Sequence, residues 1–198
     1  MNGNLIIKNA SELVTCSGFR AKKGQAMSDL AIIPDGAVVV KEGIIKTVGT
    51  TRDVMSELEK TEPDVSDFDI IDARGRSVLP GFVDSHTHFV FSGFRAEEFS
   101  WRLRGDSYMD IINRGGGIVN TVDATRKAAV DELVQLGIER LDSMLSLGVT
   151  TVEGKSGYGL DCDTEIKQLE VMTHLDRIHY MDVVPTFLGA HAIPEAYK

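Results

Sequence analysis

The residue pattern of the chain changes at Pro80 and Gly81, and this change narrows the range of possible folds. After this point, short apolar runs of strand length alternate with longer segments of helical period. The expected strands are residues 82–84, 149–153 and 183–188, and the expected helices are residues 123–147 and 163–180. This alternation predicts a parallel sheet with crossover helices, so the expected fold class is α/β.

Each of the two expected helices carries an apolar face. In the first helix the face runs from Val130 to Leu145, and Gly148 is the expected end of the helix. The apolar face of the second helix consists of Ile166, Leu169, Met172 and Leu175. Both patterns are typical of amphipathic helices.

The residues before this change have the pattern of a small β-domain. Their apolar or β-branched runs are residues 5–7, 12–15, 37–40, 44–48 and 69–72. Residues 41–43 are expected to form a hairpin turn, and residues 52–60 a short helix. We therefore expect two domains, a β-domain at residues 1–77 and an α/β domain at residues 78–198.

The second domain is short for a closed barrel. Eight strand–helix units need roughly 200–250 residues, whereas residues 78–198 hold only the first units. The sheet is thus expected to be either small and open or part of a barrel that continues beyond this chain. The chain ends soon after a strand, which favours the second alternative.

Charge and composition exclude several kinds of partner. The formal net charge is −9 and the pI is near 5.0, so nucleic acid and anionic membranes are poor partners. Cys16 and Cys162 have no C-x-x-C spacing and are expected to stay unpaired. Neither a leader nor a membrane-spanning stretch is evident, so we expect a cytoplasmic protein.

Two histidines follow the first strand of the second domain. His86 and His88 are two residues apart, so their imidazoles are expected on the same side of a strand. The carboxyl ends of parallel strands are where active sites of α/β proteins lie. Paired neutral imidazoles suit zinc or iron, although an isolated H-x-H pair is often only solvated.

Three consecutive glycines occupy residues 115–117. They follow no expected strand and lack the last glycine of a dinucleotide fingerprint, because position 120 is Asn120. We expect them to let a long active-site loop bend or approach a ligand.

The segment LPGFVDSHTH at residues 79–88 resembles the first-strand signature of the amidohydrolase superfamily. The resemblance implies a metal-dependent hydrolase with a (β/α)8 TIM barrel and a β-sandwich built from both ends of the chain. Residues 1–77 would then be the N-terminal part of the sandwich, and residues 78–198 the first part of a truncated barrel. His86 and His88 would be metal ligands.

Further segments are similar to the imidazolonepropionase family within that superfamily. They are FSGFRAEEF at 91–99, GGGI at 115–118, KSGYGL at 155–160 and FLGAH at 187–191. The family often has Cys or Val where this chain has Gly154. The resemblance implies that Arg95 binds the substrate propionate, that Tyr158 contacts the substrate, and that His191 both binds substrate and assists catalysis.

The reaction implied by the resemblance is hydrolysis of the ring amide of 4-imidazolone-5-propanoate to N-formimidoyl-L-glutamate in histidine degradation. One divalent metal, zinc or iron, would be the cofactor, and the substrate the small-molecule partner. The family's third histidine, its aspartate and its glutamate are expected beyond Lys198, so this chain alone is expected to be inactive.

Two other functions stay open. Another amidohydrolase, such as a deaminase or a dihydroorotase, would share the histidine pair but not Arg95, Tyr158 and His191. A metal-free scaffold would keep the fold without the chemistry. Neither the choice of metal nor the assembly follows from the sequence, and a homodimer is possible.

Overall fold

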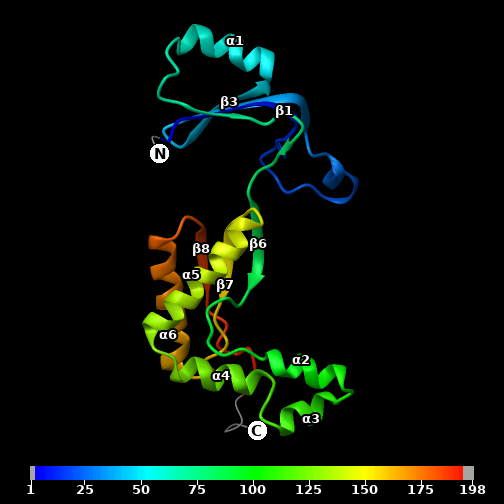
Figure 1. Ribbon diagram of the computed structural model, residues 1–198, viewed down its shortest axis with the longest axis vertical. Helices are drawn as coiled ribbons and strands as arrows, with labels where there is room; N and C mark the ends of the chain where they lie inside the picture. Colours follow the sequence, from blue (N-terminus) through cyan, green and yellow to red (C-terminus); the bar gives the residue numbers. More distant parts are fainter. Residues whose placement is uncertain (1–2, 194–198) are drawn as a thin grey trace. The chain divides into compact units, whose positions relative to one another are not determined.

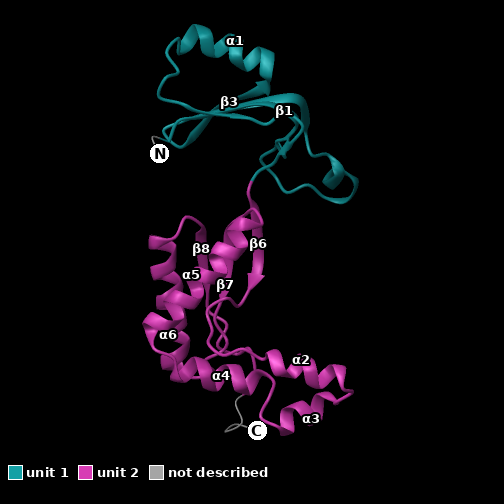
Figure 2. Cartoon of the chain, in the orientation of Figure 1, with its two compact units in different colours: residues 1–80 teal, residues 81–198 magenta. Residues whose placement is uncertain are grey.

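A computed structural model describes residues 3–193. The chain divides into two compact units, Met1–Pro80 and Gly81–Lys198 (Figure 2). Each unit has its own secondary structure and its own core (Figure 1). No helix of the described residues is both long and apolar enough to cross a membrane.

The first unit is built on a five-stranded sheet in the order β3-β2-β1-β4, with β5 also paired to β1. Its strands are β1 (Leu5–Val14), β2 (Ile32–Lys41), β3 (Ile44–Thr50), β4 (Asp69–Asp72) and β5 (Ser77–Val78). The first three strands pair antiparallel, whereas β4 and β5 run parallel to β1. Besides the strands, the unit contains the short 3-10 helix η1 (Gly24–Ser28) and helix α1 (Thr51–Thr61).

The predicted hairpin at residues 41–43 is confirmed, because β2 and β3 pair directly across it. Glu42 and Gly43 both have positive φ, as a two-residue hairpin turn requires. The prediction of separate strands at residues 5–7 and 12–15 is wrong. β1 is continuous because a shift of register after Ile7, with Asn9 at φ 59°, carries the strand through a polar stretch.

Helix α1 covers this sheet and closes a core. Val54 and Leu58 are buried on the helix and belong to the same cluster as Ile6, Ala37 and Val39 of the sheet. The Thr50 hydroxyl accepts a hydrogen bond from the Asp53 backbone N–H at 3.2 Å, which caps the helix. The helix predicted at residues 52–60 is thus confirmed.

The second unit contains a three-stranded parallel sheet in the order β6-β7-β8. The strands are β6 (Phe82–Thr87), β7 (Val149–Lys155) and β8 (Asp182–Thr186). Its helices are α2 (Ala96–Leu103), α3 (Tyr108–Asn113), α4 (Ile118–Lys127), α5 (Val130–Ser146) and α6 (Cys162–Ile178). Consecutive parallel strands joined through α5 and α6 confirm the predicted α/β class for this unit (Figure 1).

The single helix predicted over residues 123–147 is wrong, because the structure breaks it between α4 and α5. Ala128 and Ala129 are extended, with ψ 138° and 157°. Lys167 of α6 donates from Nζ to the carbonyl oxygens of Thr125, Arg126 and Ala128 at 2.9–3.1 Å. This distant lysine therefore satisfies carbonyls that a continuous helix would have used internally.

The predicted apolar face of α6 is only partly right. Met172 and Leu175 are fully buried in the main core cluster of the unit, but Ile166 is 47% exposed. The buried positions of the first two turns are instead polar, namely Thr164, Glu165 and Gln168. The inward face of α6 is therefore apolar toward its end and polar toward the loops that follow the strands.

Helices α2 and α3 were not predicted. Both are short, at 8 and 6 residues, and such lengths give a weak periodic signal. Ser107 and Asp110 form a complete capping box at the start of α3, and this sequence pattern could have revealed the helix.

Candidate active site

Four of the predicted site residues meet where the parallel strands end. His86 lies in β6 and His88 directly after it, while Tyr158 follows β7 and His191 follows β8. The ring centroids of His86 and His88 are 5.9 Å apart, and those of His88 and His191 are 4.4 Å apart and stacked. Tyr158 lies 5.3 Å from His88 and 5.5 Å from His191. Three loops far apart in sequence thus build one cluster of rings.

His88 is partly buried rather than solvated. Burial lowers the pKa of its imidazole, and the neighbouring His191 and His86 lower that pKa further. Its Nδ1 is buried and has no hydrogen-bond partner among the described residues. A neutral ring with a free buried nitrogen can donate a lone pair to a metal.

His191 is oriented by the loop that carries Tyr158. Its Nδ1 lies 3.1 Å from the carbonyl oxygen of Gly157, and a carbonyl can only accept, so Nδ1 carries the proton in this contact. A Cβ added to Gly157 would lie 2.7 Å from His191 Cβ, and the φ of Gly157 is 121°. Glycine is therefore needed here for the two loops to approach.

An ionised carboxylate lies on the central strand of this edge. Hydrogen bonds from Lys155 and Thr186 lower the pKa of Glu153. Thr186 donates from Oγ1 to Glu153 Oε1 at 2.7 Å, which ties β8 to β7. Glu153 has no predicted site role, since a glutamate two residues before the end of a strand gives no distinctive sequence pattern.

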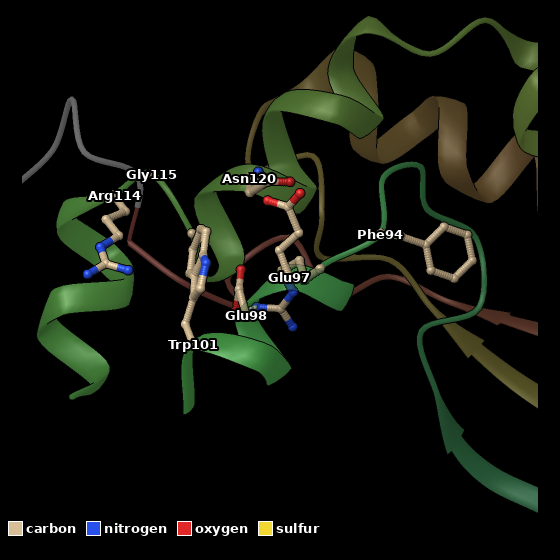
Figure 3. A pocket seen from close by; sticks show the side chains of 9 residues that line it. Phe94, Glu97, Glu98, Trp101, Arg114, Gly115 and Asn120 are labelled. Carbon is tan, nitrogen blue, oxygen red and sulfur yellow. Dashed lines mark ion pairs between the residues drawn. The ribbon is translucent and has the colours of Figure 1, made fainter. Parts of the chain in front are cut away.

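Arg95, the fifth predicted residue, belongs to a second cluster. Its Nη1 lies 3.8 Å from Oε2 of Glu98, which is buried on α2. Both residues line a small pocket of about 80 Å³, together with Trp101, Arg114 and Asn120. Figure 3 shows these side chains, with Phe94 turned away from Trp101 and Arg114. Two guanidinium groups and the carboxylates of Glu97 and Glu98 line the pocket, and a guanidinium suits a carboxylate ligand.

The three glycines form the turn that holds Glu98. Gly115 and Gly117 have φ of 81° and 76°, so the expected bend is present. Gly117 N–H donates to Glu98 Oε1 at 2.7 Å, and a Cβ on Gly116 would lie 3.0 Å from the same oxygen. The close approach made possible by these glycines is therefore to a side chain of the protein. Glu98 was missed from the sequence, where it is one of two adjacent glutamates.

Among residues 3–193, no group of three or more His, Cys, Asp or Glu side chains is arranged to hold a metal ion. His86 and His88 would supply two ligands, and catalytic zinc sites typically use three from the protein.

Cys16 and Cys162 are free and exposed, as expected, so neither thiol is engaged in a disulfide.

Comparisons with known proteins give relatives for nearly all of the chain. The model of the amidohydrolase family matches residues 69–111. The imidazolonepropionase of Clostridium tetani is 58% identical over 99% of this chain, and that of Parabacteroides distasonis 56% identical over 99%. The chain spans about half the length of these curated relatives, 46% in both cases.

Solved structures share the fold at low sequence identity. Guanine deaminase from E. coli has a TM-score of 0.57 and 15% identity, over 93% of this chain and 36% of that one. A zinc complex of the atrazine chlorohydrolase TrzN from Arthrobacter aurescens has a TM-score of 0.55 and 16% identity, over 98% and 39%. The expected amidohydrolase fold, with the first units of its barrel, is thereby confirmed, and over nearly its whole length the chain is similar in sequence to curated imidazolonepropionases.

Proposed function

We propose that this chain forms part of a metal-dependent hydrolase that opens the ring amide of 4-imidazolone-5-propanoate, giving N-formimidoyl-L-glutamate in histidine degradation. The observation that carries the proposal is the meeting of His86, His88, Tyr158 and His191 at one edge of the sheet. The names of the relatives support the choice of substrate. Residues 1–77 would contribute to the β-sandwich domain and residues 78–198 to the barrel.

His86 and His88 would hold one divalent metal, zinc or iron. The unpartnered, buried Nδ1 of His88 and the lowered pKa of its ring support this assignment. When bound, such an ion supplies a nucleophilic hydroxide at neutral pH and polarises a carbonyl group. Two imidazoles are too few for a catalytic site, so the remaining ligands would come from parts of the protein outside this chain.

The other residues would bind and orient the substrate. Arg95 would pair with the propionate through its planar fork of donors. Tyr158 and His191 would border the ring of the substrate, with His191 donating to the carbonyl oxygen under attack. Because Nδ1 of His191 is engaged with Gly157, donation from Nε2 requires the protonated imidazole.

Substitution of Arg95 tests the choice of substrate. Arg95→Met, in a full-length protein that carries this segment, should raise KM for 4-imidazolone-5-propanoate, because the propionate contact exists in ground and transition states alike. A charge-assisted hydrogen bond contributes roughly 1.5–3 kcal/mol, so kcat/KM should fall by about ten- to a hundredfold. Arg95→Lys should recover part of this loss.

Metal content is the control for this experiment. Zinc bound per protein should be the same in Arg95→Met as in the unmodified protein, since Arg95 contacts Glu98 and not the histidine pair. Unchanged kcat/KM, or loss of the metal, would refute the carboxylate-binding role.

A further inference from the structure

The segment of residues 89–92 joins His88 to the loop that carries Arg95, and it belongs to no strand. Phe89, Val90 and Ser92 are nevertheless at most 8% exposed. Buried backbone N–H and C=O groups need partners, and a neighbouring strand does not provide them here. The partners of this segment are side chains.

Side chains from three helices bind four consecutive residues of the segment. Arg140 of α5 donates from Nη1 to the carbonyl oxygens of both Phe89 and Phe91, each at 2.7 Å. Gln168 of α6 donates from Nε2 to the Val90 carbonyl oxygen, also at 2.7 Å. From α4, Thr125 accepts the Ser92 N–H at 3.1 Å. The path of the backbone between His88 and Arg95 is thus fixed by helix side chains.

Gln168 also binds the loop of Tyr158. Its Oε1 accepts the Tyr158 backbone N–H at 3.3 Å while its Nε2 donates to Val90. The side chain is fully buried, so both ends of the amide depend on these two partners. One amide group therefore connects the segment after β6 to the loop after β7.

Arg140 supports the segment after β6 directly and the ring of Tyr158 through Phe91. Its guanidinium lies over the ring of Phe91, 3.7 Å from the centroid, and that ring meets Tyr158 edge-on at 5.6 Å. The guanidinium binds backbone carbonyls, and its Nη2 is buried without a hydrogen-bond partner among the described residues. Arg140 is half-buried, so its guanidinium gives up part of its hydration and keeps the Phe89 and Phe91 carbonyls as acceptors.

We propose that Gln168 is a positioning residue of the active site, with Arg140 as its second support. Together they set the place of His88, the path from His88 to Arg95 and the position of Tyr158. This inference rests on the proposed function, since it assumes that His88 binds metal and that Arg95 and Tyr158 bind substrate. The new element is the role of the buried Gln168 amide on α6, which links the position of the metal site to the position of the substrate site.

Gln168→Glu is the test variant, in a full-length protein that carries this segment. The substitution keeps the size of the side chain and an acceptor for Tyr158 N–H, but it places an oxygen against the Val90 carbonyl. Outer-shell changes typically weaken metal sites by 10- to 100-fold. We therefore expect the zinc dissociation constant and KM each to rise by about tenfold, measured on protein that circular dichroism shows to be folded.

Gln135→Glu is the matched control, because Gln135 is exposed on α5 and its side chain donates to Glu139. It should change neither quantity. A purely structural role of Gln168 would lower the melting temperature of Gln168→Glu but leave the zinc dissociation constant and KM unchanged, and that result would overturn the proposal. Should Gln168→Glu fail to fold, Arg140→Lys applies the same test, because a lysine cannot reproduce the planar guanidinium that reaches both carbonyls.

Two reference variants separate this inference from the proposed function. His88→Ala should weaken zinc binding, and Arg95→Met should raise KM. If His88→Ala does not weaken zinc binding, or if Arg95→Met does not raise KM, the proposed function is wrong. If both act as expected while Gln168→Glu and Arg140→Lys match the unmodified protein, only the positioning role fails.

Discussion

The two units of this chain bury different kinds of side chain. Within residues 3–193, the buried polar residues all lie in the second unit, and they include Glu98, Thr125, Glu165 and Gln168. The first unit buries apolar side chains between a hydrogen-bonded sheet and one helix. In the second unit, buried polar groups hold loops whose backbone the sheet does not reach. Loops that carry a site therefore need hydrogen bonds from interior side chains, whereas the strands of a supporting sheet satisfy one another.

The largest effect is expected for His86→Ala, made in a full-length protein that carries this segment, which should remove activity with little effect on folding. His86 is exposed, so its loss opens no cavity. A catalytic metal contributes several kcal/mol to transition-state stabilisation, so kcat/KM should fall by on the order of 10³-fold or more, with loss of bound zinc. His174→Ala, at an exposed position of α6, is the matched control and should retain both metal and activity.

Ile6→Ala should instead lower the free energy of unfolding and leave metal binding unchanged. Ile6 is fully buried in the core beneath α1, and removing such a side chain costs about 2–4 kcal/mol of the free energy of unfolding. Denaturant titration measures this loss, and zinc affinity of the folded protein should not change. Ile44→Ala, at a position 60% exposed, should be nearly neutral. A change in zinc affinity with Ile6→Ala would contradict the division of roles.

Gly154 tests how tightly the second unit is packed behind its site. A Cβ at this position would lie 2.7 Å from Phe89 Cε1 and 2.9 Å from Met172 Sδ. Gly154→Val should therefore cost about 1–3 kcal/mol through overpacking. Phe89→Leu in the same protein should recover much of that loss by making room, so equal unfolding free energies for the single and double variants would show that Phe89 is not the obstacle.

The smallest effect is expected at the cap of α1. Thr50→Ala removes the hydroxyl that accepts the Asp53 N–H, and it should lower the free energy of unfolding by about 1 kcal/mol. Thr61→Ala, at the other end of the helix, is the control and should change it by less than about 0.5 kcal/mol. Neither variant should alter KM, because the cap lies in the first unit.

Local patterns in the sequence predicted the elements that depend on near neighbours. The hairpin at Glu42 and Gly43 follows from turn residues, and α1 follows from its own period and cap. The two-residue spacing of His86 and His88 placed both rings at the end of one strand. The segments that resemble the imidazolonepropionase family indicated Arg95, Tyr158 and His191 as candidates. No sequence pattern, however, gave the distances between Tyr158, His191 and the histidine pair.

The packing of distant segments determines which polar side chains are buried. Periodicity favoured Ile166 for the buried face of α6, yet Ile166 is exposed and Gln168 is buried. Gln168 is buried because it binds Val90, 78 residues away in sequence. Lys167 binds carbonyl oxygens at the end of α4, which lie 39 to 42 residues away in sequence. Burying a polar group is favourable only when the group has a hydrogen-bond partner. Here the partner is placed by the packing of distant segments. Local sequence patterns were therefore sufficient for the hairpin, helix α1 and the spacing of the histidine pair, whereas contacts between distant segments determine how buried amides and cations join these elements into a site.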